Sequence, residues 1–310
     1  YSNMFSVIWT TLYWWTRPFI KWFLRHSTKL CELQRICYGE YPGAQRTRAV
    51  EFSLNASKIP EIKKVTKYMD GKCTEYNLKP DIVYYAVFAI VRAKKINTKI
   101  HKRLSNSLGE CMMQIWGYKQ LVAQIEVLRQ QPYNSDLEEH ENALYKLWEA
   151  LNPGIPLEAR ISKQWQDIGF QGDDPKTDFR GMGMLGLENI LYFSTEHSDA
   201  ARHTLARSLH PQYGYSWAIV GINITHMAYN FLSSGEAKYH FWNATNGMPS
   251  VQSFHNFFCY LFFEFDTLWR REQPKDIMEF NRIRDKFDKN MKAKLKDPTT
   301  FLKCTFVIKL

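Results

Sequence analysis

Residues 253–272 read SFHNFFCYLFFEFDTLWRRE and carry the strongest structural signal in the chain. Their large apolar residues recur every three or four positions, the spacing that places side chains on one face of an α-helix. These residues are Phe254, Phe257, Phe258, Leu261, Phe262, Phe265, Leu268 and Trp269. An apolar stripe this wide predicts a helix packed into a large hydrophobic core.

The surrounding sequence repeats the helical pattern. Residues 215–234 (YSWAIVGINITHMAYNFLSS) are apolar on most sides and predict a central buried helix. We interpret Pro274 as the first-turn proline of the last helix. The apolar residues of that helix are Ile277, Phe280, Ile283, Phe287, Met291 and Leu295. Upstream, Ser135 and Glu138 have the spacing of a capping box. One run, 82–91 (IVYYAVFAIV), has strand-like composition but no turn and partner strand, so we predict a buried helix there. The chain is therefore predicted to be all-α.

Composition narrows the class of protein. The 310 residues are 45% hydrophobic and 23% charged, a balance that excludes wholesale disorder. The six cysteines form no CxxC pair and the histidines lack zinc-ligand spacing, so we expect no metal site. The whole excess of positive charge, +10, lies in the first 100 residues, where 17 basic residues face 7 acidic ones. This excess follows an aromatic, apolar N-terminus, which favours an anionic membrane surface over nucleic acid as its partner.

The first thirty residues combine aromatic and basic side chains. Residues 4–24 read MFSVIWTTLYWWTRPFIKWFL and contain four of the ten tryptophans. The uncharged run, residues 1–16, is shorter than the roughly 20 residues of a spanning helix, and basic residues and a proline follow it. The residues expected to meet acidic lipids are Arg17, Lys21, Arg25 and Lys29. We predict that residues 1–30 form a membrane-associating segment; the alternative is a core helix packed on the body of the protein.

The stretch from Trp165 to Gly183, WQDIGFQGDDPKTDFRGMG, interrupts the helical pattern with glycines and aspartates. Such residues build rigid polar loops, because short oxygen side chains bond nearby backbone amides. No phosphate-binding GxxxxGK[ST] motif occurs in the chain, and the loop lacks the further ligands and the nucleophile of a magnesium hydrolase.

Arg180 is the one arginine of this loop and has two interpretations. In the first it forms a structural salt bridge with a loop aspartate. In the second it is offered to a partner's phosphates. Residues 166–181 carry four acids against two bases, which does not suit a phosphate pocket within the chain. The same excess of acidic residues is compatible with an arginine that is positioned by the loop carboxylates and binds the phosphates of a partner whose own Lys and Mg²⁺ neutralise most of the phosphate charge.

The loop resembles the hallmark motif of the ELMO domain, as found in ELMO-domain-containing GTPase-activating proteins. The matching residues are Trp165, Gly169, Phe170, Gln171, Asp174, Pro175, Thr177, Asp178, Phe179, Arg180 and Gly181. Further segments similar to that family are CELQRIC (31–37), PGAQRT (42–47), GYKQL (117–121), ARISKQW (159–165), YSWAIVGIN (215–223) and IMEFNRIRDKF (277–287). Residues 73–92 depart from the family pattern, being more apolar than the charged amphipathic helix expected there.

The resemblance implies an activator rather than an enzyme in its own right. It implies stimulation of GTP hydrolysis by small GTPases of the ADP-ribosylation-factor and factor-like group, with Arg180 as the catalytic residue. Asp174, Thr177 and Asp178 would organise its loop, and Trp165 and Phe179 would anchor it. The chain would need no cofactor of its own, since the partner holds GTP and Mg²⁺. Because ELMO proteins of the scaffold type use the domain without GTPase activation, a non-catalytic membrane-tethered adaptor is the alternative.

From the same comparison we expect a single ELMO domain over residues 120–300. It would follow a membrane-associating segment (1–30) and an N-terminal helical region (31–119), and precede a tail (301–310). The expected location is the cytoplasmic face of an internal membrane, namely the endoplasmic reticulum, lipid droplets or mitochondria.

Overall fold

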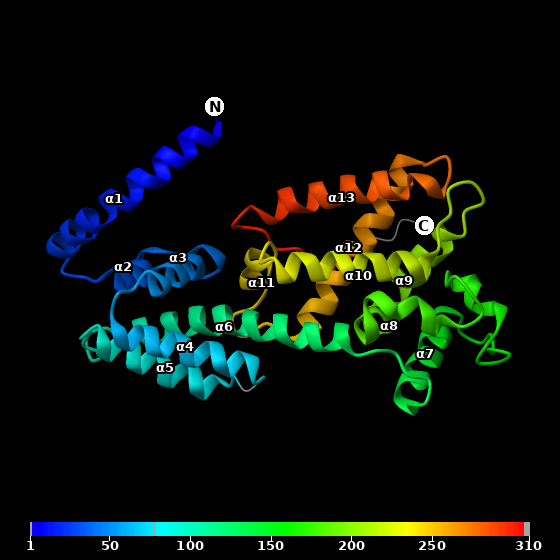
Figure 1. Cartoon of the computed structure of the whole chain (residues 1–310), viewed down its shortest axis with the longest axis horizontal. Coiled ribbons are helices and arrows are strands. Elements are labelled where there is room, and N and C mark those ends of the chain that lie inside the picture. Colours follow the sequence, from blue (N-terminus) through cyan, green and yellow to red (C-terminus); the bar gives the residue numbers. More distant parts are fainter. Residues whose placement is uncertain (1, 77, 307–310) are drawn as a thin grey trace. The chain divides into compact units, whose positions relative to one another are not determined.

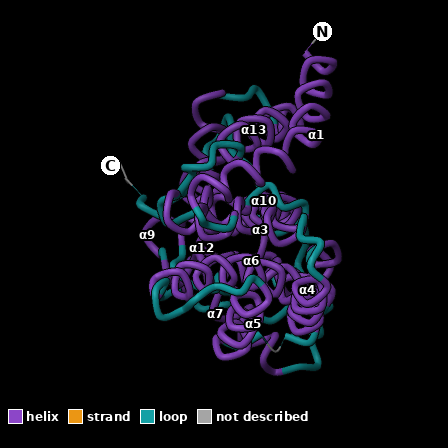
Figure 2. The backbone as a smooth tube through the Cα atoms, turned by 90° about the vertical axis from the view of Figure 1, so that its left-hand side faces the viewer, coloured by secondary structure: helices purple, strands orange, loops and turns teal. Residues whose placement is uncertain are grey.

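The computed structural model describes residues 2–76 and 78–306. The side chains of residues 2–11, 13 and 14 lie outside this description, and with them two of the four N-terminal tryptophans. Within the described ranges the chain consists of helices and loops and contains no strand (Figure 2). The prediction of an all-α protein is confirmed.

The chain divides into two compact units, Tyr1–Trp116 and Gly117–Leu310. The boundary between them falls inside the long helix α6, Lys102–Gln130 (Figure 1). Besides the first half of α6, the N-terminal unit contains α1 (Ser2–Thr28), α2 (Glu32–Gly39), α3 (Ala44–Asn55), α4 (Pro60–Thr74) and α5 (Pro80–Ala93). α2 packs on α3, α3 on α4, and α4 on α5.

Helix α1 packs through its basic side and exposes its aromatic side. Arg17, which is buried, lies 2.9 Å from a carboxylate oxygen of Glu32, and Lys21 lies 2.7 Å from the other. The Arg17 guanidinium also lies 4.8 Å from the ring centre of Phe52. The exposed large apolar side chains of α1 are Leu12, Trp15, Phe19, Ile20, Trp22 and Phe23. Because two of the four basic residues are paired with Glu32, the exposed Arg25 and Lys29 are the ones directed to solvent.

No helix in the described part of the chain combines the length and the apolarity that crossing a bilayer requires.

The run 82–91 is helical, as predicted, and lies in α5. It is buried on one face only, since Val83, Val87 and Ile90 lie in the core while the aromatic residues of the helix face outward. The prediction of a buried helix therefore holds for one face only, because the run is apolar on both faces and the neighbouring helices cover one of them.

The C-terminal unit is built around α12 (Val251–Glu272), which contacts α8 (Gly183–Glu196), α9 (Ser198–Ser208), α10 (Trp217–Ser233) and α13 (Phe280–Leu295) (Figure 1). Its phenylalanines at 254, 257, 258, 262 and 265 are fully buried, as the stripe predicts. α10 is the predicted central helix. Gly221 on α10 permits close packing, because a Cβ there would stand 2.6 Å from Ile190 and 3.2 Å from Phe262. The unit also contains α7 (Glu138–Leu151), α11 (Lys238–Ala244) and three short 3₁₀ helices, η1 (Lys163–Ile168), η2 (Pro175–Gly181) and η3 (Ile277–Glu279).

Two helix starts differ from their sequence predictions. Pro274 follows the left-handed C-cap of α12, Gln273, and so ends one helix instead of opening the next. The cap of η3 is Asp276, whose side chain accepts a hydrogen bond from the Met278 amide. Ser135 does not cap α7, because the residue at its N-cap is Leu137.

Candidate functional site

The motif loop rests on a chain of aromatic rings. Trp165, on η1, is fully buried, and its indole NH donates to the Arg160 carbonyl at 2.9 Å. Its ring meets Phe170 edge-on at 5.9 Å between centroids, and Phe170 meets Phe179 at 5.7 Å. Tyr133 flanks Phe179 from the loop before α7. These contacts fix both ends of the loop to the core of the C-terminal unit.

Gly169 joins this loop to the start of α10. Its φ of +87° lies in the left-handed region, which disfavours other residues. Its carbonyl accepts from the Ile219 amide at 3.2 Å. A Cβ at this position would stand 2.1 Å from the Trp217 nitrogen, so only glycine fits without moving backbone.

Asp174 organises the turn that carries Arg180. It caps η2, accepting from the Lys176 amide at 3.1 Å, and Pro175 occupies the first helical position with its ring buried. The Arg160 guanidinium lies 3.0 Å from the same carboxylate and also pairs with Glu141 of α7. Burial opposes ionisation of Asp174, but the Lys176 amide and Arg160 outweigh it and lower the pKa of this carboxyl.

Two further loop carboxylates, Asp178 and Asp173, bond to donors within the loop, whereas Asp167 is exposed to solvent. Asp178 accepts from the Gln171 amide at 3.0 Å, which closes the loop between its two halves. Burial raises the pKa of Asp178, and Asp174 acts in the same direction. Asp173 accepts from the Gln166 side chain at 2.9 Å. Thr177 is exposed, and its hydroxyl makes no hydrogen bond with the residues described.

Arg180 takes part in none of these hydrogen bonds or ion pairs. It is exposed on the last turn of η2, between buried Phe179 and exposed Gly181. In residues 2–76 and 78–306 no carboxylate lies within ion-pair distance of its guanidinium, and no hydrogen bond holds it. A Cβ at Gly181 would meet no atom within 4 Å, so this side of the arginine is open. The interpretation as a salt bridge to a loop aspartate is wrong, because Arg180 pairs with none of them: Asp174 pairs with Arg160, while Asp173 and Asp178 accept from Gln166 and Gln171.

The sequence prediction missed Arg160, Glu141 and Tyr133. The Arg160 side chain connects the loop to α7, and the Arg160 carbonyl accepts a hydrogen bond from the Trp165 indole NH. No local signal could have identified this role, since Glu141 and Asp174 lie 19 and 14 residues away from Arg160 in the sequence.

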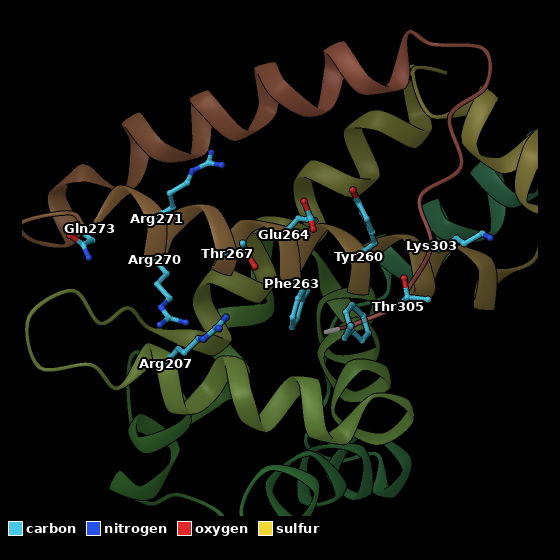
Figure 3. A pocket seen from close by; sticks show the side chains of 11 residues that line it. Arg207, Tyr260, Phe263, Glu264, Thr267, Arg270, Arg271, Gln273, Lys303 and Thr305 are labelled. Carbon is cyan, nitrogen blue, oxygen red and sulfur yellow. The ribbon is translucent and has the colours of Figure 1, made fainter. Parts of the chain in front are cut away.

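Four hollows described in the C-terminal unit contain no residue of the motif loop. One, of about 490 Å³, is bordered by α9, α12 and the C-terminal segment (Figure 3). Arg207 and Arg270 point toward each other at one end of it (Figure 3), and Arg207 is paired with the buried carboxylate of Asp266 at 2.8 Å. None of its lining residues comes from 165–181. The motif therefore combines buried anchors with exposed residues, among them Lys176, Thr177 and Arg180, that are accessible to another macromolecule.

The helical fold and this loop define a known class of domain. A sequence model of the ELMO/CED-12 family matches residues 123–284, and the chain belongs to that family. It is 46% identical over 296 residues to mouse (Mus musculus) ELMO domain-containing protein 1, covering 90% of this chain and 88% of the relative. It is also 46% identical over 295 residues to human (Homo sapiens) ELMO domain-containing protein 2, covering 95% and 97%. ELMO domain-containing protein B of Dictyostelium discoideum is 37% identical over 273 residues, covering 86% and 91%.

Proposed function

We propose that this protein is a GTPase-activating protein for small GTPases of the ADP-ribosylation-factor and factor-like group, to which it supplies Arg180 in trans. The observation that carries the proposal is the exposed guanidinium of Arg180, which makes no ion pair with the described residues, on a loop where Asp173, Asp174 and Asp178 bond to other donors. A planar guanidinium can form paired hydrogen bonds with phosphate oxygens and neutralise the charge that develops there during hydrolysis. Arginines supplied in this way accelerate GTP hydrolysis by roughly 10³–10⁵-fold in other GTPase systems.

Rigidity of the loop supports this assignment. An arginine that acts across an interface must be positioned before the partner arrives, since ordering it during the reaction would consume binding energy. Trp165 and Phe179 anchor the loop in the core, while Asp174 and Asp178 bond its backbone amides. Gly169, Phe170, Gln171, Pro175 and Gly181 complete the turn geometry, and exposed Thr177 is available to contact the partner.

In this proposal the partner GTPase holds both GTP and Mg²⁺. Acidic residues outnumber basic ones in the loop, so it would repel a nucleotide that arrived alone. A GTPase that brings its own lysine and Mg²⁺ offsets most of the phosphate charge, and one added guanidinium is then sufficient. The protein is accordingly an activator of another enzyme and needs no cofactor of its own.

We further propose that α1 attaches the protein to a membrane. Its exposed stripe contains Trp15 and Phe19, which are 84% and 67% exposed and would cost less free energy at a lipid headgroup boundary than in water. With the GTPase partner also at that surface, the proposed site of action is the cytoplasmic face of an internal membrane such as the endoplasmic reticulum, lipid droplets or mitochondria.

Single-turnover GTP hydrolysis by a panel of such GTPases tests the catalytic proposal. Arg180→Lys keeps the charge but loses the planar fork, and we expect it to reduce the stimulation by roughly 100-fold or more. Lys163→Ala is the matched control, because Lys163 is also an exposed basic residue of the motif region and should retain activity. Full stimulation by a folded Arg180→Lys protein would exclude Arg180 as the catalytic residue, whereas no stimulation by the wild-type protein would favour the non-catalytic adaptor.

A further inference from the structure

Helix α5 has an aromatic face that no part of the described chain covers. Tyr84, Tyr85 and Phe88 are 54%, 77% and 63% exposed, and their spacing places them on one side of the helix. The opposite side packs into the core through Val83, Val87 and Ile90. We call the three aromatic residues and Arg92, which continues the same stripe, the α5 face. Solvent-facing positions of a surface helix are ordinarily polar, so a contiguous aromatic patch marks an interaction surface.

The chain around the α5 face is strongly basic. From 82 to 109 it contains no aspartate or glutamate. Its basic residues are Arg92, Lys94, Lys95, Lys99, Lys102 and Arg103. All but Lys94 are exposed, and Ile100, 73% exposed, lies among them in the loop before α6. The only acid of the stripe, Asp81, is in the first turn, at the end of α5 remote from the basic cluster.

We propose that the α5 face and the basic loop after it form a second membrane-contacting surface that recognises an anionic bilayer. Aromatic side chains flanked by lysine and arginine suit the boundary between headgroups and acyl chains, where the rings enter the apolar region and the cations meet lipid phosphates. Each lysine or arginine near an anionic surface contributes about 1 kcal/mol. A second copy of this chain is disfavoured as the occupant, because pairing two such surfaces would bring like charges together.

The basic end of α5 also lies close to α1. Burial lowers the pKa of Lys94, and the charges of Lys21 and Arg25 on α1 act in the same direction. Arg25, which is exposed on α1, therefore extends the cationic region around the loop after α5, and exposed Lys29 follows it directly after the helix. In this proposal α1 and the α5 face contact the same bilayer, and each contact would then strengthen the other because the second forms at high effective concentration.

The inference deepens the membrane part of the proposed function and can be tested apart from it. We would measure co-sedimentation of the full chain with vesicles of phosphatidylcholine alone and of phosphatidylcholine with phosphatidylserine. Tyr85→Ser/Phe88→Ser should weaken binding to the anionic vesicles by roughly tenfold, because two exposed rings lose their apolar contact. Lys95→Glu/Lys99→Glu should weaken it by at least about fivefold per lysine and remove the preference for anionic lipid.

Tyr41→Ser is the matched control: Tyr41 is 90% exposed but stands alone before α3, and its loss should leave vesicle binding unchanged. Thermal unfolding of each variant establishes that it is folded. Wild-type binding by both double variants would overturn the inference, while the proposed anchoring by α1 would still stand or fall on its own substitutions. A Tyr85→Ser/Phe88→Ser chain that binds vesicles normally but stimulates GTP hydrolysis poorly without lipid would assign the face to a protein partner, which also overturns the inference.

Discussion

Replacing Gly169 with alanine should destabilise the C-terminal unit severely. The added Cβ would stand 2.1 Å from the Trp217 nitrogen, 2.7 Å from the Ser216 carbonyl carbon and 2.9 Å from the Ala218 nitrogen, all backbone atoms. Unstrained contacts between such atoms are about 3.5 Å, so the loop must move away from α10. The movement breaks the bond from the Ile219 amide, worth about 1 kcal/mol, and a φ of +87° adds about 1–2 kcal/mol for a residue with a Cβ.

When the steric overlap of the Cβ with the backbone is added, we expect Gly169→Ala to lower the free energy of unfolding by at least about 3 kcal/mol. This loss corresponds to a fall in Tm of roughly 6–12 °C for a unit of this length. Urea and thermal unfolding followed by tryptophan fluorescence measure both quantities. Gly172→Ala and Gly181→Ala are matched controls within the same motif, because a Cβ at either position meets no atom within 4 Å. If Gly169→Ala unfolds at the same urea concentration as Gly172→Ala, the argument from backbone proximity is refuted.

Three further changes have defined outcomes. Arg160→Met should lower the free energy of unfolding by about 2 kcal/mol and reduce the stimulation of GTP hydrolysis, because it leaves Glu141 and Asp174 without their shared cation. Unchanged stimulation of the partner GTPase by this variant would exclude a role for the two ion pairs in holding the loop. Burial lowers the pKa of His240 to about 4, so the folded protein keeps this imidazole neutral while the unfolded chain takes up a proton below about pH 6.5. His240 should therefore lower the free energy of unfolding by about 2 kcal/mol between pH 8 and pH 5, and His255, whose pKa burial also lowers to about 4, should add a similar amount. In urea titrations, His240→Gln should remove about half of this combined decline, and an unchanged decline would exclude the contribution of His240. Trp15→Ser/Phe19→Ser/Trp22→Ser should remove binding to phosphatidylcholine vesicles, because the exposed aromatic stripe of α1 is lost. A residual attraction to anionic vesicles should remain through the α5 face. Equal sedimentation of variant and wild type would exclude α1 as the anchor.

The sequence predicts the parts of this fold that depend on local pattern. The stripe on α12 identifies its own buried face because every large apolar residue in it has another three or four positions away. The pattern is uninformative where a helix is apolar all round: periodicity in 82–91 could not show that Tyr85 faces solvent while Val87 is buried, since that depends on where α4 packs. Pro274 was assigned to the wrong helix for a related reason, as a proline between two helices fits the end of one as well as the start of the next.

In the motif loop, too, contacts between residues close in sequence could be predicted and contacts between distant residues could not. Glycine and aspartate spacing predicts a rigid turn, and Asp174 and Asp178 bond the amides of Lys176 and Gln171 within seven residues. That Arg180 pairs with no loop aspartate could not be predicted, because this depends on which side chains from distant parts of the sequence lie next to the aspartates in the fold. Arg160, distant in sequence, occupies Asp174.

The role of Arg180 is tested most directly by the affinity for a partner GTPase carrying GDP and aluminium fluoride, which mimics the phosphoryl group in transit. A side chain that acts in the transition state should bind this form far more tightly than the form with GDP alone. We predict that the wild-type protein discriminates between the two forms by roughly tenfold or more and that Arg180→Lys discriminates between them weakly or not at all. An equal preference in both proteins would show that the guanidinium does not contact the reacting phosphate, and would contradict the account.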